Sequence, residues 1–253
     1  MRLDGKVTVI TGAGSGIGAA TAIAMAREGA RVIVADVNEA SAKAVVERIG
    51  QAGGQAVAVR ADVATAADNR MLVDTALATW GTLDVFLANA GVPQFPAAIE
   101  EEDEAVFDRI FAVNVKGVWL GAKYALAVMK QQKHGVFLVT ASTAAIRPRP
   151  GGQTYAASKG AVVTLTKSLA LECAPYGVRV VAIAPVATET PMLPTFMGKK
   201  EIDAEGMARY VATVPLGRLN RPEYLANAAV FLASDEAAMI TGSVLDVDGG
   251  RCI

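Results

Sequence analysis

The fold is decided by residues 7–18, which read VTVITGAGSGIG. The apolar, β-branched run Val7–Ile10 predicts a buried strand, and the helical pattern Gly18–Glu28 follows the glycines. Glycines let backbone amides approach a phosphate closely, and a helix N-terminus adds free N–H groups and a positive dipole. A tight turn without a ligand would use the same residues. The position of the turn between the first strand and the first helix favours a pyrophosphate-binding unit.

The rest of the chain repeats this alternation of short apolar runs and longer helical patterns. Further strands are expected at Arg31–Ala35, Ala56–Arg60, Val85–Ala88, Val136–Thr140, Arg179–Ile183 and Val244–Val247. Further helices are expected at Glu39–Gln51, Ala66–Trp80, Asp103–Gln131, Tyr155–Ala174 and Pro222–Ala233. Most of these strands are apolar on both faces, which predicts a parallel seven-stranded sheet with helices on both sides. We therefore expect a single doubly wound, Rossmann-type α/β domain over residues 1–253.

Composition narrows the class of protein. The chain has 253 residues, 53% of them apolar and 19% charged, which excludes a disordered protein. Its 24 Lys and Arg residues balance 25 Asp and Glu residues, and no basic block is present. Because phosphate backbones are bound by clustered cations, we expect no nucleic-acid partner and a small-molecule ligand instead.

Cysteine and histidine are scarce. Cys173, Cys252 and the single His134 supply neither a disulfide framework nor a zinc-binding cluster, so we expect a cytoplasmic protein without a metal site. The uncharged run of residues 7–26 is interrupted by four glycines and by Thr8, Thr11 and Ser15. These interruptions argue against a signal peptide or a membrane span.

Asp36 stands at the end of the second expected strand, twenty residues after Gly16. A carboxylate at this position can accept both ribose hydroxyls of adenosine and would repel a 2′-phosphate. The next residue is Val37, so no arginine is present there to neutralise such a phosphate. The pattern predicts NAD rather than NADP, although an aspartate before a helix can also serve as a helix cap.

A second group of polar residues surrounds the start of the helix expected at Tyr155. Tyr155 and Lys159 are four residues apart, which places the phenol and the ammonium on one helix face. A nearby cation favours phenolate and lowers the tyrosine pKa from about 10, as a general acid/base requires. Ser142 follows the strand Val136–Thr140 and lies thirteen residues before Tyr155. The three residues together predict proton-transfer chemistry.

These motifs, in this order, resemble the short-chain dehydrogenase/reductase family over essentially the whole chain. Thr11–Gly18 matches the family's Thr-Gly-x-x-x-Gly-x-Gly cofactor loop, and Asp62-Val63 matches the pair that holds adenine. Asn89-Ala90-Gly91 matches the loop that flanks the cofactor, and Asn114 matches the helix asparagine of the catalytic tetrad. The resemblance implies cofactor contacts from Gly12, Ser15, Gly16, Ile17, Gly18, Asp36, Val37, Asp62, Val63, Asn89, Ala90, Gly91, Tyr155, Lys159, Pro185, Thr188 and Thr190.

The resemblance also implies a role for each member of the tetrad. Tyr155 would exchange a proton with the alcohol or carbonyl oxygen, and Ser142 would hydrogen-bond that oxygen. Lys159 would bind the nicotinamide ribose and depress the phenol pKa, while Asn114 would hold a water that links Lys159 to solvent. The implied protein is a homotetrameric oxidoreductase that passes hydride between NAD(H) and a secondary alcohol or ketone. A 3-oxoacyl-thioester reductase and a non-catalytic NAD-binding sensor are the alternatives.

Two departures from the family pattern affect the expected site. Ala88 replaces the first asparagine of the usual Asn-Asn-Ala-Gly, and Val186 replaces the glycine of the usual Pro-Gly pair, with Thr188 two residues later. The bulk of Val186 beside the substrate space makes substrate guesses from the family unsafe. Substrate contacts are expected from Ser142, Gln153, Tyr155, Val186 and Met192, and further pocket walls from Gln94 and Ala144.

The sequence allows predictions for three more segments. Residues 187–214 contain Pro191, Pro194, Gly198 and Gly206 but no strand, which favours a substrate lid. Arg147 and Arg149 could bind an anionic substrate, but loop arginines are more often solvated or at subunit contacts, and we expect that role.

The acidic run Glu100–Glu104 is expected to open the helix Asp103–Gln131, whose positive end favours carboxylates. Apolar residues lie around most of this helix, which suggests a subunit interface. They include Phe107, Phe111, Val118 and Trp119.

Overall fold

The computed structural model describes residues 1–199, 201 and 203–253. Its sheet has the strand order β3-β2-β1-β4-β5-β6-β7, and every neighbouring pair is parallel. The strands are β1 (Val7–Thr11), β2 (Arg31–Asp36), β3 (Gln55–Arg60), β4 (Val85–Ala88), β5 (Gly135–Thr140), β6 (Val178–Pro185) and β7 (Val244–Val247). The strand order runs outward from β1 to β3 on one side and from β4 to β7 on the other, so the winding reverses between β1 and β4. This arrangement confirms the predicted doubly wound, Rossmann-type domain.

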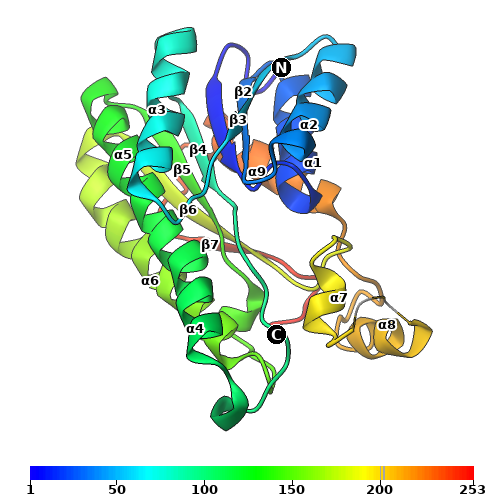
Figure 1. Cartoon of the computed structure of the whole chain (residues 1–253). Coiled ribbons are helices and arrows are strands. Elements are labelled where there is room, and N and C mark those ends of the chain that lie inside the picture. Colours follow the sequence, from blue (N-terminus) through cyan, green and yellow to red (C-terminus); the bar gives the residue numbers. More distant parts are fainter. Residues whose placement is uncertain (200, 202) are drawn as a thin grey trace.

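Helices cover both faces of the sheet (Figure 1). One face carries α1 (Gly16–Arg27), α2 (Glu39–Gln51) and α9 (Pro222–Ala233), whose apolar side chains pack on β1, β2 and β4–β6. The other face carries α3 (Ala66–Trp80), α5 (Gly117–Gln132) and α6 (Gln153–Cys173), packed around the stacked rings of Phe86 and Phe137. Burial on both faces explains why these strands are apolar without alternation.

The long helix expected at Asp103–Gln131 is interrupted. It consists of α4 (Glu104–Phe111), a π-helical turn η2 (Ala112–Lys116) and α5. A π turn adds one residue to the helical repeat, so it changes the direction in which the following side chains point, and such turns are frequent at functional sites. Asn114 lies inside this turn.

Two expectations for this helix need correction. Glu100 and Glu101 belong to a separate short helix, η1 (Ile99–Glu101), and the N-cap of α4 is Asp103, whose carboxylate accepts the amide N–H of Ala105. Most of the acidic run therefore precedes α4, and only Asp103 and Glu104 lie at the start of that helix. The second correction concerns the apolar residues expected at a subunit interface. Val118 is buried in the core of its own chain, whereas Phe107 and Trp119 remain 44% and 49% exposed.

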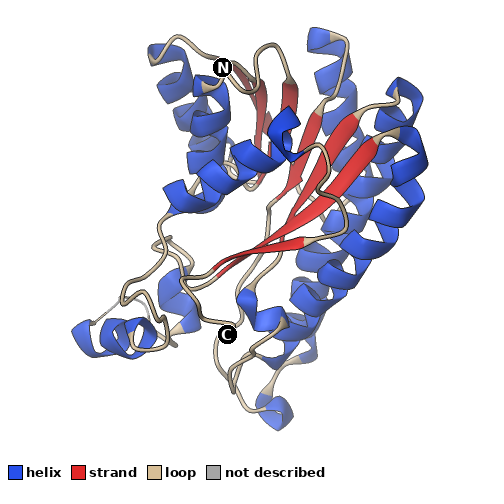
Figure 2. Ribbon diagram, turned by 180° about the vertical axis from the view of Figure 1, so that it is seen from behind, coloured by secondary structure: helices blue, strands red, loops and turns tan. Residues whose placement is uncertain are grey.

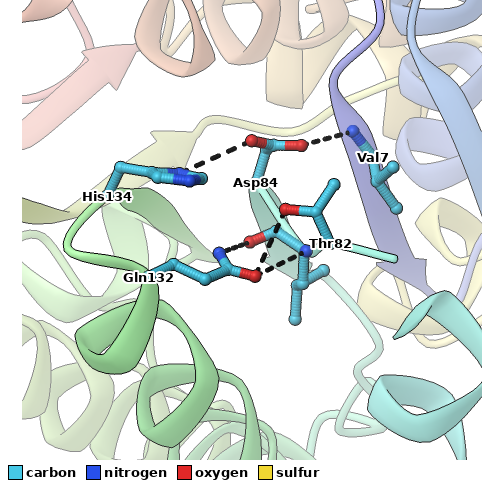
Figure 3. Close-up of polar contacts among 6 residues, drawn as sticks. Val7, Thr82, Asp84, Gln132 and His134 are labelled. Carbon is cyan, nitrogen blue, oxygen red and sulfur yellow. Dashed lines mark hydrogen bonds and ion pairs between the residues drawn. The ribbon is translucent and has the colours of Figure 1, made fainter. Parts of the chain in front are cut away.

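Polar side chains fix the amino ends of the central strands (Figure 3). Asp84 accepts the amide N–H of Val7 at 2.8 Å, and its other oxygen lies 3.5 Å from Nδ1 of His134. The amide of Gln132 both donates to and accepts from the backbone of Leu83. These bonds join β1, β4 and β5 at one edge of the sheet and leave the opposite, carboxyl edge open for a site.

Residues 187–214 leave β6 and extend beyond the carboxyl edge (Figures 1 and 2). Two short helices form there, α7 (Leu193–Phe196) and α8 (Ala204–Val211), which the sequence pattern did not predict. The described part of the segment contains no strand beyond a bridge from Thr188 to Asn220. Lys200 and Ile202 of the expected lid lie outside the described residues. Within the described ranges, no helix combines the length and apolar character of a bilayer crossing.

Candidate active site

A cavity of about 460 Å³ lies at the carboxyl edge of the sheet. Its wall contains residues that follow β1, β2, β4, β5 and β6, together with part of the 187–214 segment. All of the expected cofactor residues line it except Gly18. Of the expected tetrad, Ser142, Tyr155 and Lys159 line it and Asn114 does not. Gly12 and Thr190, which are 178 positions apart in the sequence, are thus brought to one space by the parallel topology.

The glycine loop is shaped for close approach of the backbone. Gly12 has φ of +62°, and a Cβ atom added there would lie 2.8 Å from Cα of Ala90. Gly18 does not line the cavity, because its Cα faces the loop itself, and an added Cβ would lie 2.3 Å from the carbonyl oxygen of Gly12. Gly18 therefore supports the loop rather than contacting a ligand.

The helix after this loop begins earlier than expected, at Gly16 rather than Gly18. Ser15 is its N-cap, and the Ser15 hydroxyl makes no hydrogen bond to the first turn. Ser15, Gly16 and Ile17 all line the cavity. The free N–H groups of the helix start and the open serine hydroxyl fit the oxygens of a pyrophosphate.

Asp36 lies at the end of β2 and lines the cavity beside the exposed Val37. Its Oδ2 accepts the amide N–H of Gly14 at 2.9 Å, and its Oδ1 accepts that of Asn38 at the same distance. The helix-cap alternative does not apply, because α2 is capped by Asn38, which accepts from the amide of Ser41. The two backbone bonds orient the carboxylate, and each oxygen keeps a lone pair for a ribose hydroxyl.

The loops after β3 and β4 complete the side of the cavity nearest Asp36. Asp62 and Val63 line it, and Oδ1 of Asp62 accepts the amide N–H of Ala64. Asn89 ties three strand ends together: its Nδ2 donates to Thr11 O at 2.9 Å, and its Oδ1 accepts the hydroxyl of Thr140 at 3.1 Å. Ala90 and Gly91 follow it on the wall. With Asn89 in this role, Ala88 is simply a buried strand-end residue.

Ser142, Tyr155 and Lys159 converge from β5 and α6. Lys159 is buried, its Nζ donates to the carbonyl of Thr140 at 2.8 Å, and it lies 5.6 Å from the centroid of the Tyr155 ring. Ser142 caps the short helix η3 (Thr143–Ala145), because its Oγ accepts the amide N–H of Ala144. The amide N–H of Tyr155 donates to Oε1 of Gln94 at 2.8 Å, which fixes the start of α6.

Burial controls the ionisation of this group. It raises the pKa of Tyr155 to about 12, and the hydrogen-bonding Ser142 side chain acts in the opposite direction. Burial also lowers the pKa of Lys159 to about 8, because the ammonium is removed from water. The sequence predicted a lowered pKa for Tyr155, whereas in this structure removal of the phenol from water outweighs the effect of Ser142 and raises it.

Asn114 is fully buried behind the cavity wall. Its Oδ1 accepts the amide N–H of Val92 at 2.8 Å, and its Nδ2 donates to Val92 O and to the Ser158 hydroxyl. Through these bonds the π turn η2 connects the loop after β4 to α6. The contact on α6 is Ser158, the residue before Lys159. In this structure Asn114 is connected to Lys159 through the hydroxyl of Ser158 and the backbone of α6.

Residues after β6 form the wall between the two ends of the cavity. Pro185, Val186, Thr188 and Thr190 all line it. The hydroxyl of Thr188 donates to Val186 O at 2.7 Å, so its proton is engaged, while its oxygen can still accept a hydrogen bond. Thr190 packs over Gly16, where an added Cβ would lie 3.1 Å from Thr190 Cγ2. Glycine at position 16 therefore keeps this segment close to the loop.

The substrate end of the cavity is partly apolar. Val186 and Met192 line it as expected, and the Phe196 ring packs edge-on against Tyr155 with 4.8 Å between centroids. Gln153 does not line it, because its Nε2 is turned away to the carbonyl of Ala97. Gln94 does line it, and its buried Nε2 has no hydrogen-bond partner among the described residues.

Several wall residues were missed or misjudged from the sequence. Arg147 and Arg149 line the cavity, although Arg147 remains exposed as a loop arginine was expected to be. Tyr210 on α8 and Arg251 after β7 also line it. Tyr210 belongs to the segment 187–214 that was expected to cover the substrate, whereas Arg251 lies in no motif, so only the fold of the chain after β7 reveals it.

Comparison with known proteins gives consistent matches over the full length. The family model described as enoyl-(acyl carrier protein) reductase matches residues 12–251. The 4-formylbenzenesulfonate dehydrogenase of Comamonas testosteroni is 45% identical over 255 residues, covering 100% of both chains. The crystal structure of 3-ketoacyl-(acyl-carrier-protein) reductase from Brucella melitensis, complexed with NADH, is 45% identical with a TM-score of 0.92, covering 99% of this chain and 100% of that one. A 7α-hydroxysteroid dehydrogenase complexed with NADH and 7-oxo glycochenodeoxycholic acid is 36% identical with a TM-score of 0.92, covering 98% and 95%.

Proposed function

Because the chain belongs to the short-chain dehydrogenase/reductase family, we propose that this oxidoreductase uses NAD to interconvert a secondary alcohol and a ketone, an activity of class EC 1.1.1.-. One observation carries the proposal. Ser142, Tyr155 and Lys159 line the same cavity as the glycine loop and Asp36. A proton-transfer group and a nucleotide site that share one space are what hydride transfer to a carbonyl requires.

The residues of the chain would divide the work as follows. NAD, when bound, supplies the carbon that takes or gives the hydride. Ser15 and the helix start at Gly16 hold the pyrophosphate, and Asp36 accepts the adenosine ribose hydroxyls. Lys159, which lines the cavity beside Tyr155, would bind the nicotinamide ribose.

At the reacting carbon, Tyr155 donates its phenolic proton to the carbonyl oxygen during reduction and accepts the hydroxyl proton during oxidation. Ser142 hydrogen-bonds the same oxygen and stabilises the charge that develops on it. Asn114 keeps the loop after β4 and the α6 helix in register, and in this proposal it also holds a water that relays protons from Lys159 to solvent.

Asp36 supports NAD over NADP. A 2′-phosphate placed against this carboxylate would bring two negative charges together, and the exposed Val37 offers no compensating cation. The two neighbouring structures named above were solved with NADH, which supports a nicotinamide cofactor. The choice between NAD and NADP rests on Asp36 in this proposal.

The relatives also indicate a second candidate. The Brucella melitensis protein is named a 3-ketoacyl-(acyl-carrier-protein) reductase, so reduction of a 3-oxoacyl thioester is the alternative activity. The other two names specify a formyl group on a benzenesulfonate and an oxo group on a bile acid. Both of those compounds have a carbocyclic body and an acid group, and the apolar side chains of Val186, Met192 and Phe196 on the cavity wall suit such a body.

A turnover screen tests the proposal. Purified protein would be assayed with ketones, secondary alcohols, an aldehyde and a 3-oxoacyl thioester, each with NAD(H) and NADP(H). We expect the highest kcat/KM for a cyclic or aryl ketone with NADH. Highest kcat/KM for the thioester would favour the alternative activity, and binding of NAD without any turnover would favour the non-catalytic sensor.

Assembly and lid closure belong to the same proposal. Phe107, Trp119 and Leu171 are exposed apolar side chains on α4, α5 and α6, and burying them between copies supports a homotetramer. Light scattering at micromolar concentration is expected to give a tetrameric mass, and a fully active monomer would contradict it. Residues 187–214 are proposed as the lid, because Met192 and Phe196 stand over the tyrosine end of the cavity.

A further inference from the structure

Three arginines share one wall of the cavity. Arg147 and Arg149 lie on the loop between η3 and α6, and Arg251 follows β7. These elements belong to the β5–β7 part of the sheet, whereas Asp36 ends β2. Three strand spacings separate β2 from β5, or about 14 Å at roughly 4.8 Å per strand. The arginines therefore lie toward the substrate end, away from the carboxylate that faces the adenosine ribose.

A continuous set of contacts connects these arginines to Tyr155. The Phe196 ring packs against Tyr155, and the Tyr210 hydroxyl donates to Phe196 O at 2.8 Å. The Arg149 guanidinium lies 4.0 Å from the centroid of the Tyr210 ring. Its Nη2 donates to Oγ1 of Thr213 at 2.7 Å, which holds it in place. An aromatic wall thus runs from the proposed proton donor to a fixed cation.

The positive charges on this wall are not neutralised by ion pairs. Among the ion pairs that the described residues form, none includes Arg147, Arg149 or Arg251. Nη1 of Arg147 donates to the main-chain carbonyl of Arg251 at 2.7 Å, which brings the two arginine-bearing segments together. The carboxylate of Asp248 is nearby, but its oxygens accept the amide N–H groups of Gly250 and Cys252.

Arg251 is only 7% exposed, so its guanidinium has lost most of its water. Burial lowers its pKa, the charges of Arg147 and Arg149 lower it further, and Asp248 acts weakly in the opposite direction. Holding three cations this close costs free energy, and an anion bound between them would offset that cost. Arginine N–H groups match the paired oxygens of an acid group.

We propose that the substrate carries a carboxylate or sulfonate group on an apolar body, and that Arg149 and Arg251 bind this group, with Arg147 at the cavity mouth. The reacting carbonyl or hydroxyl then lies at Tyr155, and the body packs against Phe196 and Tyr210. The inference rests on the proposed oxidoreductase function and narrows it to anionic substrates. It also gives Arg147 and Arg149 the role that the sequence placed second.

Binding of a matched pair of ketones tests the anion site without turnover. The pair is 4-acetylbenzenesulfonate, an anion, and 4-acetylbenzenesulfonamide, its neutral counterpart, titrated by calorimetry into the full chain with oxidised NAD present. We expect the anion to bind at least about tenfold more tightly, equivalent to about 1.4 kcal/mol. Arg149→Met is expected to abolish the difference, and Arg149→Lys to keep part of it. Equal affinity of the wild-type protein for both compounds would overturn the proposal.

The control for this experiment is Arg209→Met. Arg209 is exposed on α8, next to Tyr210, but it does not line the cavity. Removal of its charge changes the net charge of the protein by the same amount as Arg149→Met. We expect it to preserve the preference for the anion, and an equal loss in Arg209→Met would mean that general electrostatic attraction, not a site, produced the preference.

Turnover of the same pair with NADH separates this inference from the proposed function. We expect kcat/KM for the sulfonate to exceed that for the sulfonamide at least about tenfold, and Arg149→Met and Arg251→Met to bring the ratio close to one. The ratio is insensitive to partial misfolding, because both compounds lose activity together. Equal turnover of both by the wild-type protein would overturn the anion site and leave the oxidoreductase function. If the sulfonate binds in a way that depends on Arg149 but neither compound is turned over, the anion site would be supported and the oxidoreductase function would be contradicted.

Discussion

The two ends of the cavity are built by different means. The end near Asp36 consists of residues directly after β1, β2, β3 and β4, held by backbone hydrogen bonds and by glycines that tolerate no Cβ. The end near Tyr155 also uses the loop 143–152, the two short helices of 187–214 and residues after β7. The first end is fixed by local sequence, while the second depends on side chains brought together from distant loops. Because the two ends are built separately, different proteins with this fold can keep the same cofactor site and bind different substrates.

The largest expected effect concerns Tyr155, which defines the substrate end. Tyr155→Phe removes the transferable proton and keeps the ring against Phe196, so kcat/KM is expected to fall by about 10²–10⁴-fold while NAD affinity is unchanged. Steady-state kinetics and a cofactor titration measure the two quantities. Tyr224→Phe on α9, outside the cavity, is the matched control. Activity of Tyr155→Phe within about tenfold of wild type, a barrier change of about 1.4 kcal/mol, would contradict the assignment.

The second prediction tests the locally determined end. Asp36→Ala combined with Val37→Arg removes a repulsive carboxylate and adds a phosphate partner. Charge-assisted hydrogen bonds contribute about 1.5–3 kcal/mol, so the NAD/NADP ratio of kcat/KM is expected to fall by about tenfold to a hundredfold. Glu39→Ala, an exposed carboxylate on the following helix, is the control and should leave the ratio unchanged. A wild-type preference for NADP would refute the role of Asp36.

A pH profile sharpens the comparison at the substrate end. Alcohol oxidation requires a deprotonated Tyr155, and burial raises its pKa to about 12, so the oxidation rate is expected to increase with pH through the neutral and mildly alkaline range. Ketone reduction requires the protonated phenol and should not show this increase. Ser142 lowers the pKa of Tyr155, so Ser142→Ala should move the alkaline limb of oxidation to higher pH, with the exposed Ser243→Ala as control. An unchanged limb in Ser142→Ala would show that Ser142 does not influence the phenol.

The smallest expected effect is on dynamics. Residues 187–214 have two short helices and few fully buried side chains, so their amides should exchange readily and gain protection when NAD and a substrate analogue bind. Hydrogen exchange with and without ligands measures this, and the amides of α9 serve as an internal reference. Equal protection of 187–214 in both states would identify a rigid wall instead of a lid.

The sequence alone predicted the sheet and the parts of the cavity wall around the glycine loop and Asp36, because those features depend on short-range rules. Apolar runs without alternation predicted strands buried on both faces, and the glycine turn before α1 predicted the phosphate loop. The carboxylate twenty residues later, Asp36, followed from the same βαβ unit. Each inference needed only neighbours along one strand–turn–helix unit. Spacing along the chain grouped Ser142, Tyr155 and Lys159, and the resemblance to the family then added Asn114.

Three features depended on the tertiary structure alone. They are the π turn at Asn114, the raised pKa of Tyr155, and the grouping of Arg147, Arg149 and Arg251 on one wall of the cavity. The pKa of Tyr155 depends on removal of its phenol from water, which comes from packing and not from the lysine four residues away. Arg147 and Arg251 are 104 residues apart in sequence, and they are joined by a hydrogen bond only because the chain folds back after β6 and β7. The spacing of residues predicts contacts within an element, whereas contacts between loops depend on how the complete sheet brings their ends together.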